Sequence, residues 1–104
     1  MQGFLNKKSR SWTEYFYLWG QSWRRKLIIL TNVGLLIFDE NQLNKPSKFV
    51  STVSMTLDDQ IEWREYRRDY VFKLVDCDLS EIVFAAENAE DYKKWVDAFK
   101  LVRD

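Results

Sequence analysis

The order of hydrophobic and polar residues along the chain predicts a protein built mainly from β-strands. Short apolar runs, rich in β-branched and aromatic side chains, are separated by connections that contain Asn, Asp, Gly or Pro. They predict seven strands, at about residues 3–9, 23–31, 34–40, 49–57, 60–65, 70–76 and 80–86. The connection from Thr31 to Gly34 contains Asn and Gly, which is typical of a β-hairpin.

The segment 49–57 shows the clearest alternation. Its odd-numbered positions, from Phe49 to Leu57, are mostly apolar, whereas its even-numbered positions after Val50 carry hydroxyl groups. A period of two is expected of one strand with a buried face. Ile61 and Trp63 then predict a shorter strand over 60–65.

The end of the chain changes to a helical period. Apolar side chains recur there at spacings of three and four, at Tyr92, Trp95, Val96, Phe99 and Val102. This pattern predicts an amphipathic helix over about 89–103, with Asn88 capping its first turn. Because it is a single helical segment, we expect it to cover a core that the strands build.

Composition and charge limit the class of protein. The 104 residues fit one domain over 1–104, and the 46% hydrophobic and 16% aromatic content indicates a folded chain. No apolar run is long enough to span a bilayer, so any membrane contact is expected to be peripheral. The single cysteine, Cys77, cannot form an internal disulfide, which favours a cytoplasmic location.

The net charge is zero, but the charges are unevenly distributed. Residues 1–48 contain eight Lys and Arg against three Asp and Glu, and residues 49–104 contain eight against thirteen. Either the two halves fold together and the charges mix, or a positive patch survives folding and can bind an anion.

Four motifs, in order, resemble the pleckstrin homology (PH) domain family along the whole chain. They are Gly3-Phe4-Leu5-Asn6-Lys7-Lys8, Trp23–Thr31, Gly34–Phe38 and the helical Trp95, a structural residue in that family. The resemblance implies a seven-stranded barrel or sandwich of two near-orthogonal antiparallel sheets, capped by one C-terminal helix. It also implies that the loops after the first, third and sixth strands gather at the opposite end.

The same resemblance implies a lipid-phosphate site at that open end. The family pattern is a lysine in the first strand and basic–x–basic–x–apolar in the second, which Lys7 and Arg24-x-Lys26-x-Ile28 match. Arg offers a planar fork of donors and Lys a compact charge, and both suit phosphate. The predicted phosphate-binding residues are Lys7, Lys8, Arg10, Arg24, Lys26, Lys45 and Lys48.

Two departures from the family pattern shape the expected ligand. Sixteen residues separate Lys7 from Arg24, which is long for this loop, and the predicted loop after the sixth strand carries Asp76, Asp78 and Glu81. Acidic residues at the open end would repel a polyanion. We therefore expect a headgroup of low charge, such as phosphatidic acid or a monophosphorylated phosphoinositide.

The insertion at 10–22 is rich in aromatic residues. The candidates for insertion into a membrane interface are Trp12, Tyr15, Phe16 and Trp19. Alternatively, most of these rings pack onto the barrel. In a rival register, Trp12–Leu18 is the second strand, and Thr13 and Tyr15 then replace the basic pair.

Other functional classes lack the residues that they need. The chain has no histidine and one cysteine, so we expect no metal, no cofactor and no catalysis. Acidic residues dilute the basic and aromatic cluster from Trp63 to Arg68, which argues against nucleic acid. We expect a monomer, or one domain of a larger protein, that binds an anionic lipid at the cytosolic face of a membrane. The alternative is a protein–protein interaction scaffold of the same fold.

Overall fold

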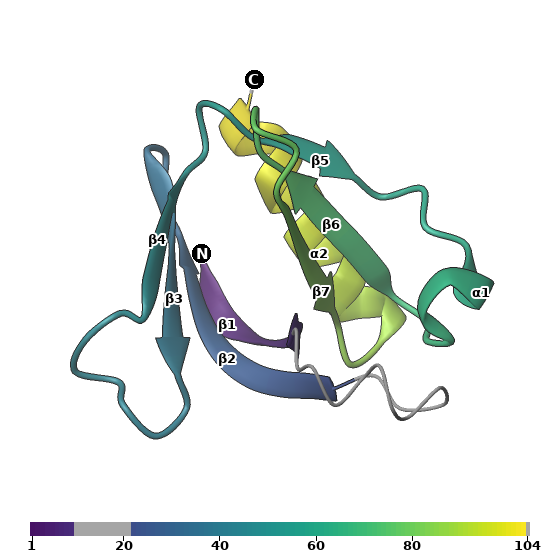
Figure 1. Cartoon of the computed structure of the whole chain (residues 1–104), viewed down its shortest axis with the longest axis horizontal. Coiled ribbons are helices and arrows are strands. Elements are labelled where there is room, and N and C mark those ends of the chain that lie inside the picture. Colours follow the sequence, from purple (N-terminus) through teal and green to yellow (C-terminus); the bar gives the residue numbers. More distant parts are fainter. Residues whose placement is uncertain (10–21, 104) are drawn as a thin grey trace.

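The computed structural model of the chain describes residues 1–9 and 22–103 (Figure 1). Its elements are β1 (Gln2–Ser9), β2 (Ser22–Leu30), β3 (Gly34–Asp39), β4 (Lys48–Ser51), β5 (Thr56–Asp58), α1 (Trp63–Tyr66), β6 (Val71–Val75), β7 (Glu81–Ala85) and α2 (Ala89–Arg103). The architecture is mainly β with one long C-terminal helix, which confirms the predicted fold class.

The seven strands form one antiparallel sheet that bends into two facing halves. Its order is β4-β3-β2-β1-β7-β6-β5. The strand β1 joins the halves, because it pairs with β2 along its whole length and with β7 at Asn6↔Ala85 and Lys7↔Phe84. Among the described strands, β4 and β5 form the two edges of the sheet, so the barrel is open between them (Figure 1).

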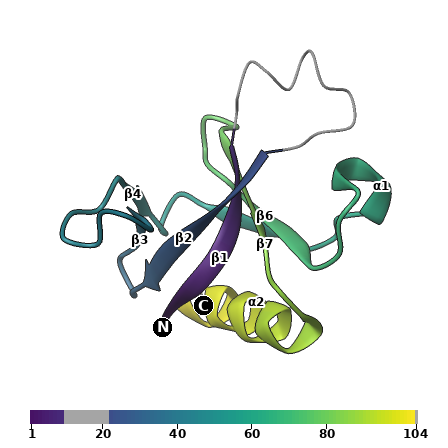
Figure 2. The ribbon, with the colours of Figure 1, turned by 90° about the horizontal axis from the view of Figure 1, so that it is seen from below.

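The helix α2 closes one end of the space between the halves, beside the start of β1 (Figure 2). The side-chain oxygen of Asn88 accepts a hydrogen bond of 2.8 Å from the Asp91 N–H, as expected of a helix cap. Trp95 is buried, and a Cβ placed at Gly3 would lie 3.3 Å from its ring. Glycine at position 3 therefore lets β1 approach the helix closely.

The core lies between the two halves of the sheet and α2. The ring centroid of Phe72 on β6 is 5.7 Å from that of Phe84 on β7 and 5.6 Å from that of Phe99 on α2. Leu5 of β1 and Ile28 of β2 complete this layer from the other half and are fully buried. Each such side chain contributes about 1.5–3 kcal/mol of transfer free energy, so these contacts stabilise the packing of the two halves against each other and against α2. No helix in the described ranges is long and apolar enough to cross a membrane.

The predicted single strand over 49–57 is wrong. The chain leaves β4 after Ser51, turns, and re-enters the sheet as β5 at its opposite edge. The burial phase also differs from the predicted alternation, because Val50 and Thr52 are buried whereas Phe49 and Val53 are 56% and 86% exposed. One straight strand cannot serve both edges of a bent sheet, so the chain breaks between them.

The predicted strand over 60–65 is also wrong. Residues 63–66 form the single helical turn α1, which ends at Arg67 with a positive φ of 54°. Ile61 and Tyr66 pack against Val71 and neighbouring residues on the outer face of β6 and β7. The helical turn places Tyr66 on the same face as Ile61, which precedes it.

Candidate functional site

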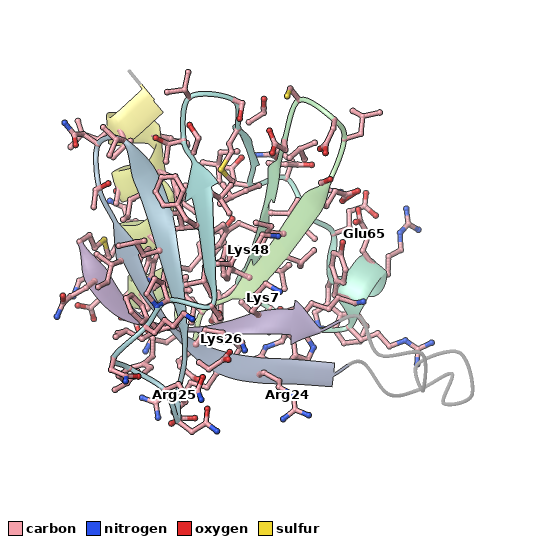
Figure 3. The ribbon with its side chains drawn as sticks, turned by 60° about the vertical axis from the view of Figure 1, so that its left-hand side comes forward. Lys7, Arg24, Arg25, Lys26, Lys48 and Glu65 are labelled. Carbon is pink, nitrogen blue, oxygen red and sulfur yellow. The ribbon has the colours of Figure 1, made fainter. Side chains whose placement is uncertain are left out.

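A cavity of about 440 Å³ opens between the two halves of the sheet, and we call it the basic cavity. Its lining residues are Lys7, Lys8, Lys48, Tyr66, Ser80, Glu81, Ile82 and Val83. They come from β1, β4, α1, β7 and the loop that precedes β7. Figure 3 looks toward this side of the molecule, with Lys48 and Lys7 near its centre. Residues far apart in the sequence therefore meet here.

The pairing of β1 with β2 places the cations of both strands at one end of the hairpin. Lys7 pairs with Arg24. Along β2, Ile28 and Leu30 are buried, and Lys26 continues their face toward solvent. Alternation therefore produces a face that is apolar near α2 and cationic near the open side, as the sequence predicted.

The fold lowers the pKa of Lys7. Its side chain is half-buried, and burial lowers its pKa, with further lowering by the positive charges of Lys48 and Lys26. Asp39 offsets part of this effect. An ammonium group that is removed from water beside two like charges is stabilised by an anion. The geometry thus provides a place for a negatively charged ligand.

Lys26 has an acidic neighbour that the sequence analysis missed. Its ammonium group forms an ion pair with Asp39 of β3. The antiparallel register places these two residues directly opposite each other. The predicted hairpin at 31–34 already implied this pairing, because Leu30 faces Leu35 and each step along β2 is matched by one along β3. The register of the hairpin was therefore the signal that could have found Asp39.

Arg24 and Lys26 line a different concavity from Lys7. This second cavity, of about 670 Å³, lies at the β2–β3 end and has the lining residues Trp23, Arg24, Arg25, Lys26, Asp39, Glu40 and Asn41. The Arg25 guanidinium already has two partners: it forms an ion pair of 3.6 Å with Glu40 and lies 4.1 Å from the centroid of the Phe4 ring. Arg24 is exposed and makes no ion pair with any described residue. The predicted cations are thus divided between two neighbouring cavities.

The remaining predicted site residues have different positions. Lys48 and Lys8 line the basic cavity, whereas Lys45 is exposed in the connection between β3 and β4 and lines neither cavity. The predicted site residue Arg10 lies outside the described residues. So do the predicted membrane-inserting residues, which are Trp12, Tyr15, Phe16 and Trp19. The second described strand is Ser22–Leu30, in which Arg24 and Lys26 pair with β1, whereas Thr13 and Tyr15 of the rival register lie outside the described residues.

The acidic residues at the open side differ in how they are neutralised. Glu81 forms an ion pair of 2.9 Å with Lys73, which also raises the pKa of Lys73. Glu81 therefore repels an anion less than its sequence position suggested. Asp76 and Asp78 form no ion pair within the described ranges. In those ranges, no group of three acidic or sulfur side chains is placed to hold a metal ion.

Comparison with known proteins settles the family. The PH domain family profile matches residues 1–103. The chain belongs to the PH domain family. The sequence matches no curated protein.

Solved structures of PH domains share the fold at low sequence identity. The C-terminal PH domain of pleckstrin, in complex with D-myo-Ins(1,2,3,5,6)P5, is 14% identical, with a TM-score of 0.77 over 100% of this chain and 94% of that one. The PH domain of ArhGAP27 is 17% identical, with a TM-score of 0.77 over 100% and 99%. The Slm1 PH domain, in complex with phosphoserine, is 21% identical, with a TM-score of 0.74 over 99% and 93%. These likenesses establish the fold of this PH domain.

Proposed function

We propose that this PH domain is a peripheral membrane-targeting module that binds the phosphate of an anionic phospholipid in the basic cavity. One observation carries the proposal: Lys7 is half-buried at the cavity wall with two further lysines acting on it. A phosphate oxygen at this position would accept hydrogen bonds from Lys7 and Lys48 and relieve their mutual repulsion. Lys26 and Arg24 lie next to this position and add attraction at longer range.

The charge balance favours a headgroup with few phosphates. Lys26 is paired with Asp39, so the cations that remain available around the cavity are few. Asp76 and Asp78 stand close by and repel a polyanion. Phosphatidic acid and monophosphorylated phosphoinositides match this balance better than a highly phosphorylated inositol does.

The structural neighbours support the ligand class through what they bind. The C-terminal PH domain of pleckstrin was solved with inositol pentakisphosphates, and the Slm1 PH domain with phosphoserine. Both ligands present phosphate groups to a PH fold. PH domains are generally binding modules without catalytic activity, which agrees with a targeting role.

Vesicle co-sedimentation with matched variants tests the proposal. We expect wild-type protein to bind phosphatidylcholine vesicles that contain phosphatidic acid, and to bind them less tightly as salt increases. Lys7→Met/Lys48→Ala, which removes two charges from the cavity, should weaken binding about tenfold or more, since the loss of even one hydrogen bond to a charged group costs about 1.5–3 kcal/mol.

Two further variants locate the site. Arg24→Ala/Lys26→Ala removes the same charge from the β2–β3 cavity, and we expect a smaller loss of binding. Lys93→Ala/Lys94→Ala removes it from the exposed face of α2, where Asp97 and Glu90 pair with these lysines at 3.5 and 3.6 Å, and should leave binding nearly unchanged. If the wild type ignores all anionic vesicles at low salt, or if the α2 variant loses as much binding as the cavity variant, the proposal is wrong.

A protein-binding role is the second candidate, and one observation favours it. Val53, after β4, and Leu79, before β7, are 86% and 80% exposed. The two connections line one common cavity, so these exposed aliphatic side chains offer an apolar contact to a partner on that side of the domain. Val53→Ser/Leu79→Ser should then abolish capture of a protein partner that Lys7→Met/Lys48→Ala still binds.

A further inference from the structure

A third cavity adjoins the basic cavity and carries the opposite charge, and we call it the acidic cavity. Its volume is about 280 Å³, and its lining residues are Lys48, Phe49, Val50, Ser51, Ser54, Met55, Leu74, Asp76, Asp78, Ser80 and Ile82. It shares Lys48, Ser80 and Ile82 with the basic cavity. The two cavities are therefore consecutive parts of one depression along the open side of the barrel.

The two carboxylates of the acidic cavity are held in place by their own turn. The Asp76 carboxylate accepts a hydrogen bond of 2.7 Å from the Cys77 N–H, and that of Asp78 accepts one of 2.9 Å from the Ser80 N–H. Hydrogen bonds from Ser54 and Cys77 lower the pKa of Asp76, and that from the Ser80 N–H lowers the pKa of Asp78. Both groups are therefore ionised at neutral pH.

Lys48 links the two charge regions, because it lines both cavities. Its positive charge also lowers the pKa of Lys7 in one cavity and that of Asp76 in the other. Buried apolar side chains, among them Met55 and Leu74, form the floor between β4 and β6. Cations at one end of this depression and carboxylates at the other suit a ligand that carries both charges.

We propose that the two cavities together bind a phosphate ester that also carries a primary ammonium group, with the phosphate beside Lys7 and Lys48 and the ammonium beside Asp76 and Asp78. This inference rests on the proposed function, because it assumes that the basic cavity holds phosphate. The ammonium group has three donors and suits carboxylate acceptors. The serine headgroup of phosphatidylserine and free O-phosphoserine share this chemistry.

The carboxylates should act in opposite directions on the two kinds of ligand. They attract the ammonium of a serine phosphate, and they repel a phosphate that has no ammonium. Asp76→Asn/Asp78→Asn removes both charges but keeps a side-chain carbonyl oxygen that can accept the same N–H groups. This variant therefore changes charge with little change in the turn.

Binding to phosphatidylserine and to phosphatidic acid vesicles tests whether the two carboxylates affect the two lipids in opposite directions. We expect Asp76→Asn/Asp78→Asn to bind phosphatidylserine vesicles about threefold to tenfold more weakly than the wild type does, and phosphatidic acid vesicles more tightly. Glu90→Gln/Asp97→Asn on α2 makes the same change in net charge and should shift both lipids equally and slightly. If the cavity variant binds both lipids more tightly by the same factor, its carboxylates only repel anions and the inference is overturned.

Soluble competitors separate a lipid source from a free ligand. O-phosphoserine should displace wild-type protein from phosphatidylserine vesicles at lower concentration than N-acetyl-O-phosphoserine, which keeps the phosphate and carboxylate but lacks the cation. If O-phosphoserine binds and phosphatidylserine vesicles do not, the ammonium phosphate ester comes from a soluble compound. Equal displacement by both compounds overturns the ammonium contact.

The failure of this inference is distinguishable from failure of the proposed function. If Lys7→Met/Lys48→Ala loses binding to phosphatidic acid while the Asp76→Asn/Asp78→Asn variant treats both lipids alike, the basic cavity binds phosphate without an ammonium contact. If wild-type protein binds neither lipid at low salt, the proposed function is wrong, and if it does not bind O-phosphoserine either, this inference is wrong as well.

Discussion

Asp39 competes with a bound anion for the ammonium group of Lys26, so its removal should increase lipid binding. The two side chains form an ion pair across β2 and β3, at the end of the register that begins at the 31–34 turn. In Asp39→Asn, the amide oxygen can still accept a hydrogen bond from Lys26, but the negative charge is gone. The full charge of Lys26 then acts on a phosphate in the neighbouring basic cavity.

The size of this effect follows from the exposure of the pair. The Lys26 side chain is 19% exposed and that of Asp39 is 36% exposed, so water screens part of their attraction. Partly exposed pairs of this kind contribute up to about 1 kcal/mol. Releasing Lys26 should therefore tighten binding to phosphatidic acid vesicles about twofold to fivefold at low salt, and less at high salt. Titration of vesicles in a co-sedimentation assay measures the change.

The adjacent residue provides a matched control. Glu40→Gln makes the same change in net charge one position further along, but Glu40 pairs with Arg25, whose guanidinium lies over the Phe4 ring. We expect Glu40→Gln to tighten binding less than Asp39→Asn does. If the two variants are indistinguishable, only net charge matters, and if Asp39→Asn binds more weakly than the wild type, the competition argument is refuted.

Three predictions concern stability, measured by urea denaturation. Lys7→Met should stabilise the domain at neutral pH. Because folding lowers the pKa of Lys7, the wild type gains stability as the pH rises from this lowered pKa to 10.5. The difference in unfolding free energy between variant and wild type should therefore shrink over that window, and a pH-independent difference would contradict the burial argument. Phe72→Ala should cost about 3–5 kcal/mol, because the ring is fully buried, and a cost below about 1 kcal/mol would show that the core repacks. Gly34→Ala should cost about 1–2 kcal/mol, because its Cβ would lie 2.3 Å from the Phe49 ring, and most of that cost should vanish in a Phe49→Ala background.

Within residues 1–9 and 22–103 the number of strands equals the seven predicted, although two of the predicted segments were wrong. The predicted segment 49–57 contains two strands, and the predicted strand 60–65 is replaced by a helical turn, so the two errors cancel in the count. Alternation of residues predicts extended structure but does not show where a strand must cross from one edge of a sheet to the other. Burial of Val50 and Thr52 instead of Phe49 depends on that crossing.

The candidate site was predicted in part. Strand alternation and the family resemblance indicated Lys7, Arg24 and Lys26, but the structure divides them between two cavities. The contribution of Tyr66 and Ser80 to the basic cavity could not be predicted, because they reach it from elements distant in the sequence. The pairing of Glu81 with Lys73 likewise depends on the register of β6 with β7.

The sequence by itself determined the local structure of this protein: the hairpin from β2 to β3, the capped amphipathic helix α2, and the cationic end of β1 and β2. These features depend on side-chain period, turn residues and caps, all of which act between near neighbours in the chain. The tertiary structure alone decided which charges meet. Lys48 lies between Lys7 and Asp76 because β4 and the loop before β7 face each other across the open side of the barrel. The separation of β4 from that loop is set by the packing of the whole core.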